Sequence, residues 1–398
     1  MRIADFCKTA AGGTPLKSNK SFYEGGNIPW LLSGEVGKKN ITSTNNFITQ
    51  AGLEGSSAKI FPKNAVLIAM YGATAGEVGI LRCEAATNQA VCGIYPNEKV
   101  IPEYLYYFFL NHKELLVAQA VGNAQPNISQ QKIKDTEIPL PPVAEQKRIV
   151  AILDRAFADI DKARALTEQN LKNARELFES YLQQVFSQRG EGWETKYLAE
   201  LCTFSSGGTP SKKNDAYWAG DIPWVSGRDM KGTQLSDTTL HISQSAVDES
   251  STRMAPEGSL LILVRGMGLA HGAQVVELLR PCAFNQDIRA IHLASRIVPR
   301  FLVLALRHRI NNSSNALSNA AHGTLKIDMD QLKGLEITLP SVEKQAVTVA
   351  KIDELLASTD ELLSRYQDKL KYLDELKKSL LQKAFTGQLT NSNKEAAA

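Results

Sequence analysis

The most regular pattern in this chain is a run of apolar residues separated by alternating steps of four and three. It occurs twice, from Val143 to Phe186 and from Val342 to Phe385, and neither run contains proline or glycine. A step of 3.5 residues sustained over four heptads predicts a coiled coil. About 44 helical residues span about 65 Å, further than a domain of under about 150 residues extends, which argues against a single helix lying on a globular core.

The predicted seam of this coiled coil has ten positions in each helix, and most of them are apolar. In the first helix the seam comprises Leu153, Phe157, Ile160, Arg164, Thr167, Leu171, Ala174, Phe178, Tyr181 and Val185. In the second helix it comprises Ile352, Leu356, Thr359, Leu363, Tyr366, Leu370, Leu373, Lys377, Leu380 and Ala384. Because one such helix closes each half of the chain, we expect the two to pair with each other in antiparallel fashion. That pairing predicts a pseudo-two-fold axis, with the globular parts held at opposite ends.

The segments before the two helices carry shorter patterns. Apolar runs bounded by glycine, asparagine and proline predict strands, as at 65–70, 258–264 and 290–293. One amphipathic helix is expected in each half, at 102–119 and 299–311, and both begin near a proline that fits a first helical turn. The predicted fold class is therefore mixed α/β (α+β): two strand-rich domains joined by two long helices.

Short motifs repeat between the halves and make the duplication explicit. The pairs are Gly12–Pro15 with Gly207–Pro210, Asn27–Trp30 with Asp221–Trp224, Ser33-Gly34 with Ser226-Gly227, Asn88-Gln89 with Asn285-Gln286, and Ile138–Pro141 with Ile337–Pro340. The chain is thus expected to divide into a globular domain at 1–141, a long helix at 142–190, a second globular domain at 191–340, a second long helix at 341–388 and a flexible tail at 389–398.

Composition narrows the function classes only slightly. The formal net charge is +3, with 43% hydrophobic and 22% charged residues, which permits an acidic partner without pointing to one. No run approaches 18 apolar residues and the first residues lack an apolar signal core, so we expect no membrane partner and a cytoplasmic location. Five cysteines without a Cys-x-x-Cys pair indicate reduced thiols and argue against a zinc site.

Catalytic motifs are not found in the sequence. The glycine-rich loops at 71–76 and 265–272 lack the Gly-Lys-Ser/Thr ending of a phosphate loop and the third glycine of a dinucleotide site. Each loop fits either a tight turn between strands or a close approach of backbone to a ligand. The six histidines do not recur between the halves, and no metalloprotease, nucleophile-elbow or amino-methyltransferase motif is present. We therefore expect a chain that is not itself an enzyme.

Taken together, these blocks carry a resemblance to a known family. Two variable domains that open with Gly-Gly-Thr-Pro and Ile-Pro-Trp, and that close with Ile-Pro-Leu-Pro-Pro-x-x-Glu-Gln and a long helix, resemble the DNA specificity subunit of type I restriction–modification systems. The resemblance covers essentially the whole chain. The second closing block departs from the first, with Ser341 in place of the second proline and Ala346 after Gln345.

The resemblance implies a function and a set of partners. Each globular domain would be a target recognition domain that reads one half of a bipartite target in double-stranded DNA, and the helix pair would set the spacer. The helices would also dock two modification (methyltransferase) subunits, and restriction (translocase and nuclease) subunits would join them. S-adenosylmethionine, ATP and Mg would be held by those partners, and this chain would hold no cofactor or metal.

Candidate DNA contacts are polar or basic residues in loops beside the repeated motifs. In the first domain they are Lys17, Lys20, Ser33, Glu35, Lys38, Lys39, Tyr71, Thr74 and Gln125. In the second they are Lys212, Lys213, Ser226, Arg228, Asp229, Lys231, Arg265, His271 and His322. Arg228 and Arg265 have the side chain that forks onto guanine O6 and N7, whereas a single loop lysine is more often a solvated charge. Trp30, Trp224 and the aromatic run 104–109 fit the core better than a base-stacking surface.

Three other interpretations stay open at this point. A specificity subunit of a type II-like system, which cuts beside its site, would have the same sequence features, and a fused methyltransferase–nuclease partner would distinguish it. A coiled-coil scaffold that binds protein or glycan would ignore nucleic-acid sequence. An enzyme would lose turnover when its histidines are replaced.

Overall fold

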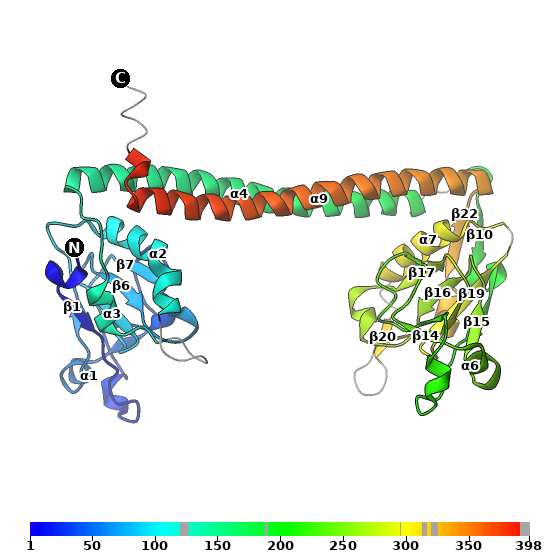
Figure 1. The fold of residues 1–398 in the computed structure, drawn as a ribbon, viewed down its shortest axis with the longest axis horizontal. Coiled ribbons are helices and arrows are strands. Elements are labelled where there is room, and N and C mark those ends of the chain that lie inside the picture. Colours follow the sequence, from blue (N-terminus) through cyan, green and yellow to red (C-terminus); the bar gives the residue numbers. More distant parts are fainter. Residues whose placement is uncertain (120–126, 188–189, 295, 313–316, 320–324, 391–398) are drawn as a thin grey trace, which may run out of the picture. The chain divides into compact units, whose positions relative to one another are not determined.

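The two halves of the chain build the same pair of β-sheets (Figure 1). The computed structural model describes residues 1–119, 127–187, 190–294, 296–312, 317–319 and 325–390. Two compact units are present. The first comprises residues 1–169 and 366–398, and the second comprises residues 170–365.

In the first unit, the two sheets have five and four strands. The larger sheet has the order β1 (Thr9–Ala11), β9 (Val91–Ile94), β6 (Val66–Ala69), β7 (Val78–Leu81), β3 (Asn40–Ile41). The smaller has the order β4 (Phe47–Ile48), β2 (Ile28–Leu31), β8 (Ala85–Thr87), β5 (Ile60–Phe61). The helices are α1 (Gln50–Glu54), α2 (Pro102–Ala118), α3 (Gln130–Asp135) and the start of α4 (Val143–Ser187). The predicted strand at 65–70 and helix at 102–119 are confirmed.

The second unit repeats both strand orders. Its larger sheet runs β11 (Cys202–Ser206), β19 (Ile288–Leu293), β16 (Leu260–Leu263), β17 (Val275–Leu278), β13 (Gln234–Leu235). Its smaller sheet runs β14 (Leu240–Ile242), β12 (Ile222–Val225), β18 (Cys282–Phe284), β15 (Arg253–Ala255). Two-stranded pairs join β10 (Glu194–Tyr197) to β22 (Glu336–Leu339) and β20 (Leu317–Asn319) to β21 (Leu325–Ile327). The helices are α5 (Leu198–Leu201), α6 (Gln244–Glu249), α7 (Pro299–Asn311), α8 (Met329–Lys333), the end of α4 and the first part of α9 (Val342–Phe385). The duplication predicted from the sequence is therefore a duplication of topology.

The repeated Gly-Gly-Thr-Pro motif allows the backbone to pack closely against the neighbouring strand at the junction of the two sheets. A Cβ atom on Gly12 would lie 2.1 Å from the Thr87 hydroxyl, and one on Gly207 would lie 2.1 Å from the Phe284 carbonyl oxygen, so both positions admit only glycine. The next glycine accepts a hydrogen bond from the Ile-Pro-Trp indole at 3.0 Å in the first unit and 3.1 Å in the second. Both tryptophans are buried, as expected from the sequence.

The repeated glutamine after Pro-x-x-Glu fixes the start of each long helix. Gln146 accepts a hydrogen bond from the Ile101 amide at 3.0 Å and donates to the carbonyls of Lys99 and Pro141, both at 2.8 Å. Gln345 forms the same three bonds in the second unit, with the Val298 amide at 2.9 Å, the Arg296 carbonyl at 3.3 Å and the Pro340 carbonyl at 3.0 Å. Both side chains are fully enclosed. Each glutamine therefore ties its long helix to the start of α2 or α7, and we call these two residues the glutamine locks.

The helix seam lies where the heptad pattern places it. No seam position of α4 or α9 is exposed, and all of them are described residues. In the first unit Leu153, Leu381 and Ala384 share one core with α2, Phe157 and Leu380 pack against it, and the Tyr104 ring meets Phe385 edge-on. In the second unit Leu182, Val185 and Ile352 form a cluster with Leu304 of α7.

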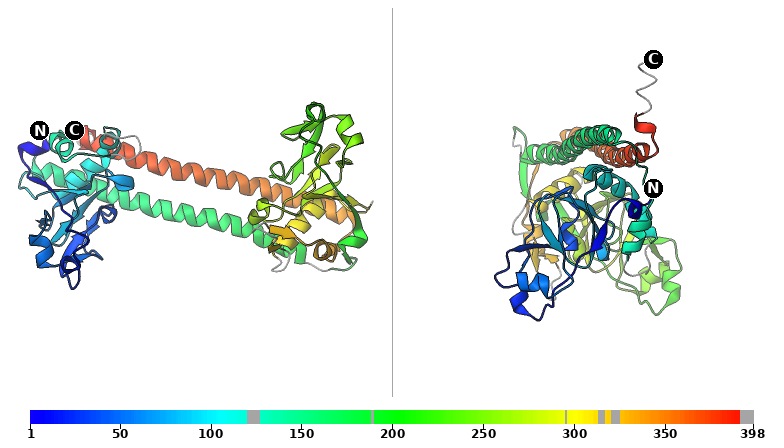
Figure 2. Two further views of the ribbon diagram at one scale, coloured as in Figure 1. Left: turned by 90° about the horizontal axis from the view of Figure 1, so that it is seen from below. Right: turned by 90° about the vertical axis from the view of Figure 1, so that its left-hand side faces the viewer.

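The direction of pairing is antiparallel. In the first unit Asp161 pairs with Lys377 and Arg164 pairs with Asp374, so the partner's number falls as the number on α4 rises. Figures 1 and 2 show α4 and α9 side by side within each unit. The expected antiparallel coiled coil is thus confirmed.

The seam, and not its flanking ion pairs, should hold the helices together. Asp374 is 59% exposed in its pair with Arg164, and exposed pairs contribute about 0–1 kcal/mol. Asp374→Ala is therefore expected to lower the free energy of unfolding by less than about 1 kcal/mol, as measured by urea denaturation. Ile160→Ala, which opens a cavity at a residue only 5% exposed, should cost about 2–5 kcal/mol. Equal losses would mean that the ion pairs carry the pairing.

Among the described residues, no helix is both long and apolar enough to cross a membrane.

Candidate nucleic-acid interface

A hollow on the surface of the second unit gathers most of the polar loop residues singled out in that domain. Its volume is about 850 Å³, and Ser226, Arg228, Lys231, Arg265 and His271 all line it. Two loops supply them, the turn after β12 and the segment between β16 and β17, and the loop before β19 adds Asn285 and Asp287 to the lining. The fold thereby brings Ser226 and His271, which are distant in sequence, to the same hollow.

The second of these loops is held in shape by glycine and by α7. Gly266 and Gly272 have φ angles of +136° and +100°, which other residues rarely adopt. Between them lies η6 (Met267–His271), so the glycine-rich loop is a short 3-10 helix between strands. The Ala273 amide donates to the Asn311 side chain at 2.7 Å, which anchors the end of this loop to the last turn of α7.

Arg307 of α7 also lines the hollow. Its guanidinium donates to the carbonyl of Val275 at 3.0 Å and to the carbonyl of Gly232 at 2.5 Å. Burial lowers the pKa of this guanidinium, and the nearby positive charge of Arg300 lowers it further. Arg307 therefore joins the turn after β12 to β17 and adds positive potential beneath the exposed side chains.

The exposed charges around the hollow are not neutralised by neighbours. Arg228, Lys231 and Arg265 are exposed and form no ion pair within the part of the chain that the structure describes. Asp287 also lines the hollow and, by the same measure, has no ion-pair partner. Charged groups without an internal partner, gathered in a concavity, are typical of a binding surface.

Asp229 has a different role from its neighbours. Its carboxylate accepts hydrogen bonds from the amide and hydroxyl of Ser226 at 2.9 and 2.7 Å, and from the amide and hydroxyl of Thr239 at 3.2 and 3.1 Å. Glu35 accepts from the Leu32 amide at 2.9 Å and from Thr44 in the first unit. Both carboxylates shape their turns, so the structure moves them from the candidate contacts to the supporting framework.

The hydrogen bonds to Asp229 should make the stability of the protein depend on pH. Burial alone would raise the pKa of this carboxyl, but the bonds from Ser226 and Thr239 outweigh it and lower the pKa below its ordinary value of 3.8. A lowered pKa stabilises the fold above the unfolded-state pKa, and this contribution is lost as pH falls through the folded-state pKa.

We expect Asp229→Asn to flatten the acid limb of the stability curve below about pH 4, as measured by urea denaturation between pH 2 and pH 6. Asp215→Asn, at an exposed position in the same unit, is the matched control. An acid limb as steep as that of the unmodified chain would contradict this role.

The equivalent hydrogen bonds of Asp229 and Glu35 also determine which residues of the two units correspond in these turns. They align Glu35 with Asp229, and the buried Val36 with the buried Met230. The matching Ser-Gly pairs of the sequence are thus offset by one residue in space: Gly34 corresponds to Arg228. The reason is that the carboxylate cap, and not the serine, sets the turn.

In the first unit the corresponding positions carry no charge. Gly34, Gly37 and Tyr71 take the places of Arg228, Lys231 and Arg265. Ala90 takes the place of Asp287, because its carbonyl accepts from the Met70 amide as that of Asp287 accepts from Val264. Tyr71 is 38% exposed, and Ser33 and Thr74 are half-buried in the neighbouring turns. The two units therefore present different chemistry on the same framework.

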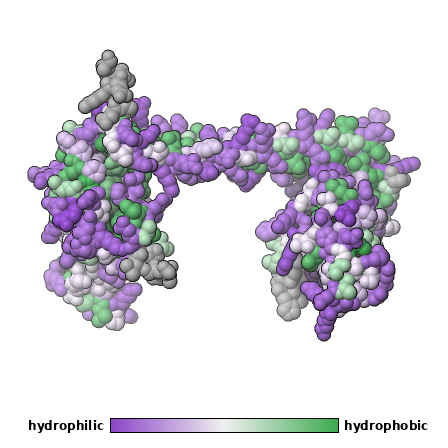
Figure 3. All heavy atoms as spheres, viewed as in Figure 1, coloured by the Kyte–Doolittle hydropathy of each residue, from purple (hydrophilic) through white to green (hydrophobic). Residues whose placement is uncertain are grey.

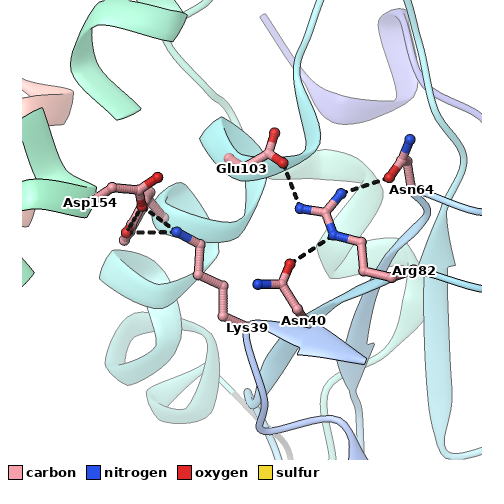
Figure 4. A network of polar contacts seen from close by, with 7 residues as sticks. Lys39, Asn40, Asn64, Arg82, Glu103 and Asp154 are labelled. Atoms are coloured by element: carbon pink, nitrogen blue, oxygen red, sulfur yellow. Dashed lines mark hydrogen bonds and ion pairs between the residues drawn. The ribbon is translucent and has the colours of Figure 1, made fainter. Parts of the chain in front are cut away.

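Lys39 directly precedes β3, and its side chain reaches α4. Its ammonium group is paired with Asp154 of α4 and donates to the Tyr107 hydroxyl at 3.0 Å (Figure 4). Nearby, Arg82 joins β3 to α2 through Asn40 at 2.7 Å and Glu103 at 2.5 Å. Lys39, predicted as a DNA contact, thus fastens the globular domain to the long helix in this structure. Arg300 does the same in the second unit, with Asp353 at 2.6 Å.

The remaining candidates are distributed as follows. Lys17, Lys20 and Lys38 of the first unit and Lys212 and Lys213 of the second are exposed, and the two of the second unit do not line the hollow. Gln125 and His322 lie outside the described residues. Sequence reasoning missed Asp287, Gln274 and Arg307 in the lining. For Asp287 a signal existed, because it directly follows the repeated Asn285-Gln286 pair.

Comparison with known proteins gives a consistent result. The family model described as "Type I restriction modification DNA specificity domain" matches residues 1–170 and 190–372. The specificity subunit of the type I restriction enzyme MjaIX from Methanocaldococcus jannaschii is 26% identical over 287 residues, and that of EcoR124I/EcoR124II from Escherichia coli is 27% identical over 272 residues. Each match covers 67% of this chain and 66% of the relative's own length.

Solved structures with the same fold are also found. One, from work on complex assembly and conformational transition of the type I R-M system, has a TM-score of 0.77 at 21% identity and covers 98% of this chain and 97% of its own. The HsdS subunit from Thermoanaerobacter tengcongensis has a TM-score of 0.65 at 20% identity, covering 98% and 96%. These likenesses concern the fold.

Proposed function

Because the chain belongs to the type I restriction–modification DNA specificity family, we propose that it selects the DNA sequence on which a modification and restriction complex acts. Each unit reads one half of a bipartite target in double-stranded DNA. Catalysis resides in the partner subunits, and this chain supplies specificity. Phosphate contacts position each unit on the duplex, and contacts to base edges specify the half-site.

A single observation carries this proposal: the two units share both strand orders but differ in the chemistry of the same loops. The framework residues are repeated, as with the two glutamine locks and the two buried tryptophans. The exposed positions on that framework are not, as with Gly34 and Arg228 or Tyr71 and Arg265. One framework carrying two unlike surfaces fits two unlike half-sites.

The long helices fit the role of a spacer. Each is an uninterrupted helix, of 45 residues in α4 and 44 in α9, without glycine or proline to bend it. A fixed separation between reading surfaces is what a fixed spacing between half-sites requires. We therefore assign the spacer length of the target to the helix pair.

Apolar side chains outside the seam support docking of modification subunits on the helices. In the first unit Leu166, Tyr372 and Leu376 are 57%, 64% and 46% exposed, and in the second Leu177 is 69% exposed. In Figure 3 apolar residues interrupt the polar surface along the helices. Tyr372 and Leu376 are four residues apart and so are neighbours on the surface of α9, and a group of exposed apolar residues on a mostly polar surface is typical of a protein interface. S-adenosylmethionine is then held by the modification subunits, and ATP and Mg by the restriction subunits.

The proposal is tested by co-expressing the full chain with its modification subunit and mapping methylated adenines in the host DNA by long-read sequencing. A bipartite motif with an unspecified spacer is expected, and a host that expresses the modification subunit alone should lack it. Unmethylated DNA, with the complex assembled and S-adenosylmethionine present, would contradict the proposal and favour a scaffold.

A further inference from the structure

The hollow of the second unit differs from an ordinary phosphate site in one respect: it combines donors with an acceptor. Arg228, Lys231 and Arg265 present positive charge, and Asp287 presents a carboxylate in the same lining. A carboxylate repels a phosphate group and weakens its binding. The same carboxylate can accept a hydrogen bond from the exocyclic amine of cytosine.

This combination matches the major-groove edge of a G·C pair. Guanine presents two acceptors, O6 and N7, which an arginine fork engages together, and the paired cytosine presents its N4 amine, which an aspartate accepts. An A·T pair presents neither two adjacent acceptors on its purine nor a donor on its pyrimidine.

We propose that the hollow of the second unit reads guanine in a G·C pair, with Arg265 or Arg228 on the guanine and Asp287 on the cytosine. This inference rests on the proposed function, and it deepens it by naming the base chemistry of one half-site. The first unit, with Gly34, Tyr71 and Ala90 at the corresponding positions, does not read its half-site in this way.

Hydrogen bonds around the hollow hold in place the backbone segments from which the proposed base contacts project. Arg307 joins the turn after β12 to β17 through the carbonyls of Gly232 and Val275, at 2.5 and 3.0 Å. The backbone at Arg265 is itself paired in a β-bridge with Lys326, and the adjacent Gly266 amide donates to the Leu325 carbonyl at 3.1 Å. On its other side the Val264 amide donates to the Asp287 carbonyl at 2.8 Å. Arg265 therefore projects from a backbone whose neighbours are held on both sides, and Arg307 acts as a positioning residue.

The test uses the full chain assembled with its modification subunit and compares methylated motifs for Arg265→Ala, Arg228→Ala, Asp287→Ala and Arg280→Ala. Arg280 is exposed beyond the opposite end of β17 and does not line the hollow, so it is the matched control. Loss of a bidentate contact should relax discrimination at one G·C position roughly 10- to 100-fold. The Asp287 variant should relax the same half-site, while the other half-site and the spacer stay unchanged.

Arg265→Lys separates base reading from phosphate binding. Lysine keeps the charge but loses the planar fork, so we expect it to relax the guanine position nearly as much as alanine does. A lysine variant that behaves as the unmodified chain, or an alanine variant that weakens methylation equally at all sequences, would overturn guanine reading in favour of a phosphate contact.

The outcomes keep the two proposals apart. If the unmodified complex methylates no bipartite motif, the proposed function fails. If the unmodified complex does methylate a bipartite motif, but these variants relax discrimination at no guanine of either half-site, only the reading of guanine by the hollow fails. Thermal melting of each variant beside the Arg280→Ala control shows that the fold is retained.

Discussion

Replacing either glutamine lock by leucine is expected to lower the free energy of unfolding by about 3 kcal/mol. Gln146 and Gln345 are 0% and 1% exposed, and each satisfies one backbone amide and two backbone carbonyls at the junction of domain and helix. Leucine fills a similar volume but removes the partners of these mostly part-buried groups. A fully buried unsatisfied group costs about 1–3 kcal/mol, so three part-buried groups are expected to cost about 1 kcal/mol each. Urea denaturation followed by circular dichroism measures the loss.

Gln183→Leu makes the same replacement at an exposed position of α4 and should change stability by less than about 0.5 kcal/mol. The loss should be of similar size at Gln146 and Gln345, because the bonds are equivalent. A loss at one site only would show that the two junctions are not equivalent despite their common geometry.

Deleting one heptad from each long helix is expected to shorten the spacer of the target and leave both half-sites intact. The pairing of Asp161 with Lys377 and of Arg164 with Asp374 sets the register in the first unit, and the matched deletions counted from it are Thr167–Asn173 and Arg365–Lys371. Seven helical residues correspond to about 10 Å, or about three base pairs of DNA at about 3.4 Å each. The measurement is the methylated motif of the assembled complex.

Lys172→Ala, within the deleted segment and exposed, should leave the motif unchanged and serves as the length-preserving control. Removing the heptad from α4 alone should break the seam register and abolish methylation. A double deletion that altered the half-sites and kept the spacer would contradict the assignment of spacing to the helices.

The fold could be predicted largely from the sequence because its strongest signals are periodic or repeated. The 3.5-residue step placed every seam residue of α4 and α9 on the unexposed face, and the prolines at 102 and 299 marked the first turns of α2 and α7. The two sheets were harder to predict. Strands as short as Asn40–Ile41 and Phe47–Ile48 pair through backbone groups, whose partners leave no pattern in sequence.

The site could be predicted only in part, because a loop residue belongs to it by its position in the folded chain, and the sequence does not give that position. Arg228 and Arg265 are far apart in sequence yet line one hollow. Lys39 looked like its neighbour Lys38, but only Lys39 meets a carboxylate on α4. Similarly, the acidic Glu35 and Asp229 proved to cap turns. A charge in a loop does not reveal whether its partner is another segment of the chain or a ligand.

The most direct test of the account exchanges one reading surface. Residues 1–141 are replaced by the corresponding segment of another family member with a different target, and the chimera is assembled with the modification subunit for methylation mapping. One half-site is expected to change to that of the donor, while the other half-site and the spacer stay the same. A change in both half-sites, or in neither, would contradict independent reading by the two units.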